Sequence, residues 1–399
     1  MIDARAARNE PDETRRRLAR KGAAGAFDAW LAADETWREV VPRVDELRAR
    51  TKLKGKPTPE QLEELRGVKE ELQRAEAELA AAEAARDELG LRIPNPPADD
   101  VPDGSTEDDA VELRRAGEPP RLDEAKEHLA LGRFDMERAA RMSGARFGYW
   151  IGDTGRLALA LYRYALDRLA EKGFVTVLPP VLVREEALIG TGAFPSDEQN
   201  VYELEADGLY LAGTAEIPVA SLHAGEILEP DELPLRYVAF SPCFRREAGA
   251  AGRDTRGMIR VHQFNKVEQF ALTVPEASWD EQELLLANTE ELVRDLGLPY
   301  RVVVLPAGDM SSASAKTYDV EVWFPSQERY REAASISNTT DFQARRLGIR
   351  YRSDSGLQPV HTLNGTATTD RTVLAILENF QGEVPDVLRE YGAPATVRP

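Results

Sequence analysis

Regularly spaced apolar residues in the first hundred positions predict a pair of long helices. In residues 60–91 the apolar positions form two rows with seven-residue spacing, and Glu, Lys and Arg fill most positions between them. The members of these rows are Leu65, Leu72 and Leu79, and Val68, Ala75, Ala82 and Leu89. Such spacing is typical of the seam of a coiled coil.

A second helix is predicted over residues 27–50, where apolar residues also recur every seven positions. These residues are Trp30, Trp37 and Val44, with Phe27 and Val41 beside them. Only a short break, KLKGKPTPEQ, separates the two helices, so we expect them to form an antiparallel hairpin. Proline lacks the amide hydrogen that a helix interior uses, and Pro42 is therefore expected to kink the first helix.

The pattern changes after the hairpin. Residues 93–109, IPNPPADDVPDGSTEDD, are rich in proline and acid and show no hydrophobic period. We therefore predict a linker over 101–121, between a helical domain of residues 1–100 and a second domain of residues 122–399.

The second domain is predicted to be α+β. Short runs rich in Val, Phe and Tyr predict strands, and the segments 154–172, 276–296 and 367–382 predict helices. Because the strands are grouped rather than alternating strictly with helices, we expect an antiparallel sheet flanked by helices.

The composition excludes several classes of protein. The chain has 42% hydrophobic and 30% charged residues, and no apolar run long enough for a transmembrane helix. Its first residues, MIDARAARNEPDETRRR, lack the apolar stretch of a signal peptide. A single cysteine, Cys243, excludes an internal disulfide, and with four scattered histidines no structural zinc is expected. We expect a cytoplasmic protein without a membrane partner.

The formal net charge of the chain is -19, and such an acidic charge argues against nonspecific nucleic-acid binding. Two segments of the sequence are nevertheless strongly basic. The first is the predicted hairpin tip, LRARTKLKGKPTP, whose five basic residues are Arg48, Arg50, Lys52, Lys54 and Lys56. It is either a solvated turn or a phosphate-contacting tip on a long arm. The second is FRREAGAAGRDTRG (244–257), which contains Arg245, Arg246, Arg253 and Arg256.

The second basic segment joins two predicted strands, one ending near residue 246 and one over 259–270. Alternation along the later strand places on one side Arg260, His262, Phe264, Lys266 and Glu268. Arginine forks suit phosphate and an aromatic ring suits a nucleobase, so this side is either a nucleotide site or a set of surface salt bridges with Glu247 and Glu268. Neither common glycine-rich phosphate loop occurs, so arginines on a sheet would hold a nucleotide.

Six segments carry a family resemblance. FRREAGAAGRDTRGMIRVHQFNKVEQF resembles motif 2 of class II aminoacyl-tRNA synthetases in its seryl-tRNA synthetase form. TLNGTATTDRTVLAILENFQ resembles motif 3, and GFVTVLPPVLVREEALIGTGAFP resembles motif 1. GTAEIP, YDVEVWFPSQERYREAASISNTTDFQARR and MSGARF are similar to further segments of the same enzymes. The chain is identified as a member of this family over its whole length, including the helical arm.

The resemblance implies an ATP site with bound Mg²⁺. Its ATP-binding residues would be Arg245, Arg246, Glu247, Phe264, Glu332, Ala333, Ala334, Ser335 and Arg371. Arg245 would grip the α-phosphate of ATP and the carboxylate of the amino acid, and Glu247 would contact the adenine amino group. Phe264 and Arg371 would cover the two faces of the base. Glu332 and Ser335 would hold Mg²⁺, and the catalytic residues would be Arg245, Arg260 and Arg371.

The resemblance also implies the substrates. Serine would be bound by Thr214, Ala215, Glu216, Arg245, Glu268 and Thr366. The tRNA would contact the arm tip at Arg48, Arg50, Lys52, Lys54 and Lys56, and the motif 2 segment at Arg253 and Arg256. The implied reaction activates L-serine with ATP to seryl-adenylate and transfers it to the 3′ end of tRNA(Ser), with tRNA(Sec) as a second candidate acceptor. A homodimer through motif 1 is implied as well.

Two other functions are compatible with parts of the sequence. One is a paralogue that activates an amino acid and transfers it to a carrier protein or biosynthetic acceptor. A long arm with a basic tip would have little use in such a paralogue, because a basic tip of this kind serves to bind a large polyanionic partner. The other is a catalytically inactive binding protein, which the presence of Arg245, Glu332 and Arg371 disfavours.

Overall fold

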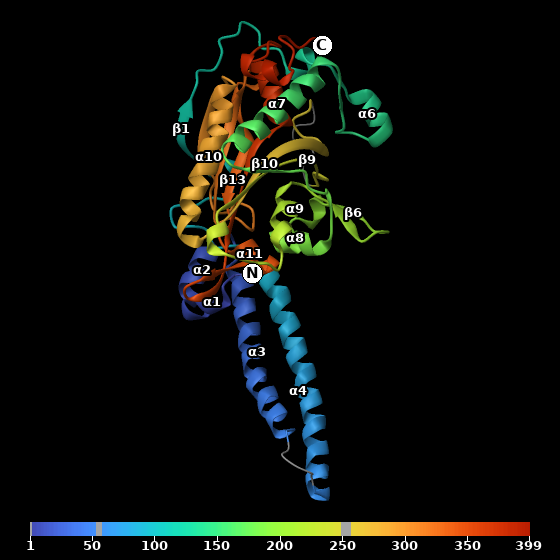
Figure 1. Ribbon diagram of the computed structural model, residues 1–399, viewed down its shortest axis with the longest axis vertical. Coiled ribbons are helices and arrows are strands. Elements are labelled where there is room, and N and C mark those ends of the chain that lie inside the picture. Colours follow the sequence, from blue (N-terminus) through green and yellow to red (C-terminus); the bar gives the residue numbers. More distant parts are fainter. Residues whose placement is uncertain (1, 53–57, 249–256) are drawn as a thin grey trace. The chain divides into compact units, whose positions relative to one another are not determined.

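The computed structural model describes residues 2–52, 58–248 and 257–399, and contacts divide the chain into two compact units, Met1–Pro96 and Pro97–Pro399. The first unit is helical, with its two long helices side by side (Figure 1). Its elements are α1 (Ala4–Asn9), α2 (Pro11–Ala19), α3 (Ala24–Arg50) and α4 (Pro59–Leu91). The predicted pair of long helices is therefore confirmed.

The seam between α3 and α4 follows the predicted apolar rows on α4. Val68 and Ala75 are buried there, and Leu72 and Leu79 are half-buried against the same cluster. Thr58 begins α4 with a capping box, in which the Gln61 backbone N–H donates to the threonine hydroxyl at 3.3 Å and the Gln61 side chain accepts from the Thr58 N–H at 2.8 Å.

The seam on α3 differs from the prediction at one position. Val40, 5% exposed, is buried in the seam with Val44 and Leu47, whereas Val41 is only half-buried. Val40 and Leu47 are seven residues apart and lie three residues after Trp37 and Val44, so they form the second row of the same heptad, and Val41 lies one position off that row. Pro42 is exposed, and α3 continues past it to Arg50.

The second unit is built on an eight-stranded sheet with the strand order β1-β11-β12-β13-β16-β10-β9-β4. Its pairs are antiparallel except β4 with β9, so the predicted α+β class is confirmed. The strands are β1 (Val111–Ala116), β4 (Val175–Val177), β9 (Leu235–Phe244), β10 (Gln263–Thr273), β11 (Tyr300–Val304), β12 (Lys316–Phe324), β13 (Arg329–Asn338) and β16 (His361–Thr369).

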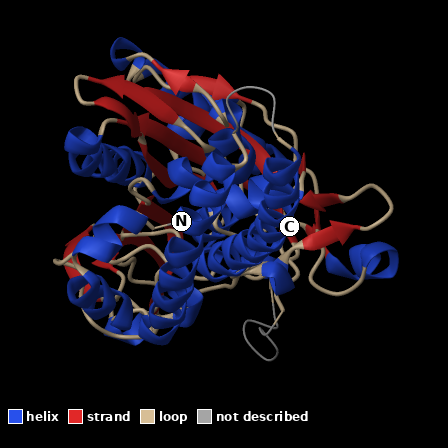
Figure 2. Cartoon of the chain, turned by 90° about the horizontal axis from the view of Figure 1, so that it is seen from below, coloured by secondary structure: helices blue, strands red, loops and turns tan. Residues whose placement is uncertain are grey.

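The two faces of this sheet have different neighbours. Three helices pack on one face: α7 (Asp153–Glu171), α10 (Ser278–Asp295) and α12 (Asp370–Asn379). Figure 1 shows α7 and α10 beside the long strands, and Figure 2 shows helices packed against the strands of the sheet. Val267 and Ala271 of β10 belong to the core on the helix face. Because strand residues alternate, Lys266 and Glu268 point to the opposite face.

Smaller elements complete the unit. The helices are α5 (His128–Leu131), α6 (Met136–Ser143), α8 (Glu185–Thr191), α9 (Glu216–Ala220) and α11 (Phe342–Leu347). The strands are β2 (Phe134–Asp135), β3 (Tyr149–Trp150), β5 (Leu182–Val183), β6 (Tyr202–Leu204), β7 (Leu209–Leu211), β8 (Ile227–Leu228), β14 (Arg350–Ser353) and β15 (Gly356–Pro359). They form the sheets β15-β14-β8, β5-β7-β6 and β2-β3. Within the described ranges, no helix is both long and apolar enough to cross a membrane.

Three sequence predictions are corrected. The predicted linker 101–121 contains β1, which pairs with the edge strand β11, because an unpaired sheet edge accepts a short β-prone segment. The predicted helix 367–382 begins only at Asp370, since the threonines before it extend β16 and Thr369 caps α12 by accepting from the Arg371 N–H at 3.2 Å. The strand expected over 259–270 begins at Gln263.

Replacing Val40 with alanine should destabilise α3 by about 1–2 kcal/mol, because it removes buried methyl groups from the seam. Val41→Ala is the matched control: it makes the same chemical change at the next position of the same helix and should cost less than about 0.5 kcal/mol. Hydrogen exchange of peptides from α3 measures both effects. Equal losses of protection in the two variants would contradict the observed register.

Candidate active site

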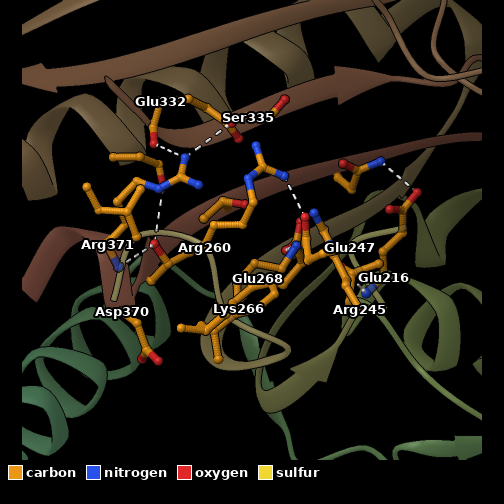
Figure 3. Close-up of a pocket in the computed structure, with 18 of the residues that line it drawn as sticks. Glu216, Arg245, Glu247, Arg260, Lys266, Glu268, Glu332, Ser335, Asp370 and Arg371 are labelled. Carbon is orange, nitrogen blue, oxygen red and sulfur yellow. Dashed lines mark hydrogen bonds and ion pairs between the residues drawn. The ribbon is translucent and has the colours of Figure 1, made fainter. Parts of the chain in front are cut away.

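A cavity of about 350 Å³ opens on the face of the large sheet that the three long helices leave uncovered. Most of its polar side chains come from the strands β10, β13 and β16 and from the ends of neighbouring elements. In Figure 3, Arg371 points toward Glu332, and Arg260 points toward Glu247. The residues that line the cavity are Thr214, Glu216, Arg245, Glu247, Met258, Ile259, Arg260, Val261, Phe264, Lys266, Glu268, Ser311, Ser314, Glu332, Ala333, Ser335, Ser337, Asn364, Thr366, Thr369, Asp370 and Arg371.

Arg371 and Glu332 form one end of the cavity. The Arg371 guanidinium donates from Nη1 to the backbone oxygen of Glu332 and lies 3.3 Å from its carboxylate Oε2. The Glu332 side chain is 52% exposed. Partial desolvation among the cavity walls works to raise its pKa, but the charges of Arg371 and Arg245 outweigh this and hold the pKa below its ordinary value. This carboxylate is therefore ionised near neutral pH.

Two further arginines follow along the cavity. Arg260 donates from Nη1 to the Glu247 carboxylate at 2.5 Å, so one of the salt bridges that the sequence left open does occur. Glu247 has a backbone φ of +51°, a left-handed conformation that costs energy for a residue with a side chain. Arg245 donates from Nε to the Gly213 carbonyl at 3.3 Å, and its guanidinium lies 5.3 Å from the ring centre of Phe264.

The other end of the cavity has no arginine pair and holds two carboxylates, Glu216 and Glu268, beside Lys266. Lys266 and Glu268 form an ion pair whose side chains are almost fully buried. Glu216 accepts from the side-chain amides of Gln343 at 2.7 Å and Asn364 at 2.9 Å. Burial, and then the nearby charge of Glu268, raise the pKa of Glu216 to about 7. This end can therefore exchange a proton near neutral pH.

The oxygen donors around Glu332 suit a magnesium ion. The hydroxyl-bearing Ser335 lies on the same strand and lines the same cavity, and Asp319 stands opposite Ser335 on β12. Within the described ranges, the buried Asp319 Oδ1 has no hydrogen-bond partner, and burial together with the charge of Glu332 raises the pKa of this carboxyl well above its ordinary value. The described residues contain no cluster of three or more His, Cys, Asp or Glu arranged for a metal, so water and phosphate oxygens would supply further ligands.

A second cavity of about 390 Å³ adjoins the first behind Arg260, Glu332 and Arg371, which line both. Its lining includes Arg301 and Arg329 and also several acidic residues, namely Glu107, Asp108, Asp309, Asp319 and Glu321. The space next to the arginine-rich end is therefore larger than the first cavity alone.

The structure brings together twelve of the residues predicted for ATP, serine, magnesium or catalysis. These are Thr214, Glu216, Arg245, Glu247, Arg260, Phe264, Glu268, Glu332, Ala333, Ser335, Thr366 and Arg371. Three others do not line the cavity. Arg246 is exposed beyond the end of β9, Ala215 is buried in the apolar cluster around α9, and Ala334 faces the core on the helix side of β13.

Of the predicted tRNA contacts, Arg48 is engaged within the arm, where its guanidinium lies 3.0 Å from the Glu76 carboxylate. Arg50 and Lys52 are exposed at the end of α3. The remaining predictions, Lys54, Lys56, Arg253 and Arg256, lie outside the described residues.

Among the cavity residues that received no role from the sequence are three charged ones, Lys266, Asp319 and Asp370. Lys266 could have been found, because alternation already placed it on the site face of β10. Asp319 could have been found from the alternation in YDVEVWFP. Asp370 could not, because its position depends on the Tyr162 hydroxyl, which donates to its carboxylate from α7. Burial raises the pKa of Asp370 to about 6.

Comparison with known proteins agrees with this arrangement. Residues 201–380 match the tRNA synthetase class II core domain (G, H, P, S and T), and this segment contains most of the residues that line the cavity. Residues 1–97 match the Seryl-tRNA synthetase N-terminal domain. The chain belongs to the seryl-tRNA synthetase family.

The similarity extends over the full length of individual relatives. The chain is 44% identical to the serine–tRNA ligase of Mycolicibacterium vanbaalenii, with 100% of both chains covered. The seryl-tRNA synthetase of Pyrococcus horikoshii, solved with ATP, has a TM-score of 0.93 at 38% identity and full coverage of both chains. The cytoplasmic enzyme of Naegleria fowleri, solved with AMP, has a TM-score of 0.88 at 33% identity, covering 97% of this chain and 95% of the other.

The raised pKa of Glu216 predicts a pH-dependent stability. Its folded pKa of about 7 exceeds the ordinary value of 4.5, so the folded state binds more protons than the unfolded state between these values. The free energy of unfolding should therefore fall as the pH rises through this window, by up to about 3 kcal/mol from this group. Glu216→Gln keeps an oxygen for Gln343 and Asn364 and should remove that share of the fall. Chemical denaturation at about pH 5 and about pH 8 measures the free energy of unfolding of both proteins. If this free energy falls equally in the variant and the wild type between the two pH values, the raised pKa assigned to Glu216 is wrong.

Proposed function

We propose that this chain is a serine–tRNA ligase, which activates L-serine with ATP and transfers the seryl group to the 3′ end of tRNA(Ser), with tRNA(Sec) as a second candidate acceptor. The observation that carries the proposal is the division of one cavity into an arginine-rich end and a carboxylate-rich end. The first suits the phosphates of ATP, and the second suits an amino acid with its ammonium group. The full-length relatives that are tRNA ligases give no support to a carrier-protein ligase.

The arginines serve the adenylation step. Arg245 binds the α-phosphate and the serine carboxylate, so that a carboxylate oxygen attacks the α-phosphorus in line as the bond to pyrophosphate breaks. A carboxylate is already a competent nucleophile, so no general base is needed, and catalysis consists of positioning and charge stabilisation. Arg260 and Arg371 line both this cavity and the adjoining one, which supports their contact with the departing pyrophosphate.

Adenine and magnesium have candidate contacts at the same end. Phe264, near the Arg245 guanidinium, offers a flat apolar face to the base, and Glu247 lies beside it as an acceptor for the amino group. Glu332 and Ser335 would hold Mg²⁺ through oxygen. Such an ion would neutralise phosphate charge when bound.

Serine recognition falls to the carboxylate end. Glu268 and Glu216 attract the ammonium group, and Thr214 and Thr366 face the cavity with hydroxyls. In β10 and β16, Glu268 and Thr366 are direct cross-strand partners, so the ammonium and side-chain contacts have a fixed spacing. A site built around a hydroxyl leaves polar groups unpaired with alanine, and can reject it by roughly 10⁴-fold.

The helical arm and the edge of the sheet offer surfaces for two partners, the tRNA and a second copy of the chain. The exposed basic residues at the end of α3 suit the phosphates of tRNA on an otherwise acidic protein. Val175, Leu178 and Leu182, in the motif 1 segment at the end of the sheet, are 58%, 75% and 43% exposed. An exposed apolar edge supports a homodimer at this segment. Charging of tRNA for translation supports a cytoplasmic location.

A panel of amino acids in the ATP–pyrophosphate exchange assay tests the function. Serine should support exchange, while alanine and threonine should support at least about 100-fold less. Arg245→Ala should abolish exchange, because the α-phosphate loses its bidentate partner. Arg246→Ala is the matched control, since that neighbouring arginine lies outside the cavity, and it should retain most of the activity. Activation of another amino acid, or full activity of Arg245→Ala, would contradict the proposal.

Reversing the charge at the arm tip should separate the two steps. In the double variant Arg50→Glu and Lys52→Glu, serine-dependent exchange should remain within about 2-fold of wild type, whereas tRNA charging should fall by at least about 10-fold at moderate salt. Arg92→Glu provides the control, because the 33 residues of α4 place it about 50 Å along the arm from the tip. Normal charging by the double variant would exclude the arm tip as the tRNA contact.

A further inference from the structure

A buried histidine–carboxylate pair lies outside the catalytic cavity. His128, at the start of α5, and Glu378, in α12, both have fully buried side chains, and His128 Nδ1 lies 2.7 Å from Glu378 Oε1. Ser326 donates to the other oxygen of Glu378, from its hydroxyl at 2.6 Å and from its backbone N–H at 3.2 Å. Burial works to raise the pKa of Glu378, but the hydrogen bonds from His128 and Ser326 outweigh it and lower the pKa. The carboxylate is therefore ionised.

These contacts define the protonation of the ring. An ionised carboxylate only accepts hydrogen bonds, so Nδ1 of His128 carries a proton. The second nitrogen, Nε2, accepts from the backbone N–H of Met258 at 3.2 Å and therefore carries none. The imidazole is neutral, and Glu378 selects the tautomer that leaves Nε2 free to accept.

The backbone that the ring holds belongs to the cavity wall. Met258 and Ile259 line the cavity, and Arg260 follows them directly. Pairing of β10 with β9 begins only at Gln263, so the residues before it depend on anchors other than the strand ladder. Gly257 has φ +74°, and a Cβ there would come within 2.6 Å of His128 Nε2, so the chain approaches the ring as closely as glycine allows.

We propose that His128 is a positioning residue for adenylation. Its ring, oriented by Glu378, fixes the backbone at Met258 and thereby sets the place of Arg260 in the cavity. A displacement of about 1 Å at a group that stabilises the reacting phosphate costs on the order of 100-fold in rate. The kinetic part of this inference rests on the proposed function, whereas the hydrogen bond to Met258 does not.

Two substitutions at His128 separate its two hydrogen bonds. In His128→Gln, the longer amide can reach the position of Nε2 and accept from Met258. In His128→Asn, the amide can occupy the position of Nδ1 and donate to Glu378, but nothing reaches Met258. We expect His128→Asn to lower kcat for serine-dependent ATP–pyrophosphate exchange by about 10–100-fold and to leave KM for serine within about 2-fold. His128→Gln should stay within about 3-fold of wild type in kcat.

Hydrogen exchange of the Met258 amide gives a readout independent of activity. Protection should be present in the wild type and in His128→Gln and should be lost in His128→Asn. Equal kinetic losses in the two variants, or wild-type kinetics of His128→Asn, would overturn the positioning role. If His128→Asn fails to fold, hydrogen exchange of the Met258 amide in the wild type still tests the proposal, because an unprotected Met258 amide would overturn it. Absence of serine-dependent exchange in the wild type would instead contradict the proposed function and leave the exchange-protection test valid.

Discussion

The register between β10 and β16 is the constraint on which the cavity depends. In this antiparallel pair Glu268 lies opposite Thr366, and Lys266 lies opposite Thr369. A slip by one residue would turn Lys266 and Glu268 toward the apolar core under α7 and α10 and would expose Val267 in their place. Burying those charges among apolar side chains would cost several kcal/mol. The hydrophobic face of the sheet thus fixes the composition of its polar face.

Within this register, the charges of the cavity are set by one another. The Lys266–Glu268 pair is nearly fully buried, so removal of either partner would leave an uncompensated charge. Glu216, next to this pair, responds by a pKa raised to about 7. An ammonium group between the two carboxylates would favour the ionised form of Glu216, so binding of an amine and loss of a proton are linked at this end of the cavity.

The sequence predicts local features well and distant contacts poorly. Heptad spacing found the helices of the arm, and strand alternation found the site face of β10, because both depend on neighbouring residues. Val40 was missed because the adjacent Val41 is equally apolar, and only the seven-residue spacing to Leu47 assigns Val40 to the second row of the seam. The pairing of β1 with β11 was missed because an edge strand depends on what lies beside it. The His128–Glu378 contact joins residues 250 positions apart, and no local pattern marks either member.

Each arginine of the cavity is held by an acceptor of the protein itself. Arg371 contacts Glu332, Arg260 contacts Glu247, and Arg245 contacts a backbone carbonyl. A held guanidinium loses less side-chain entropy when it binds phosphate, which favours the preorganised geometry that in-line attack requires. With Glu216, Glu268 and Asp370, these two carboxylates give the cavity five acidic side chains against four cationic ones, so the cavity does not attract polyanions by net charge. Binding of a polyphosphate there depends on the geometry of the donors and on cations that accompany the phosphates, and this explains how a chain with a formal charge of -19 can hold one.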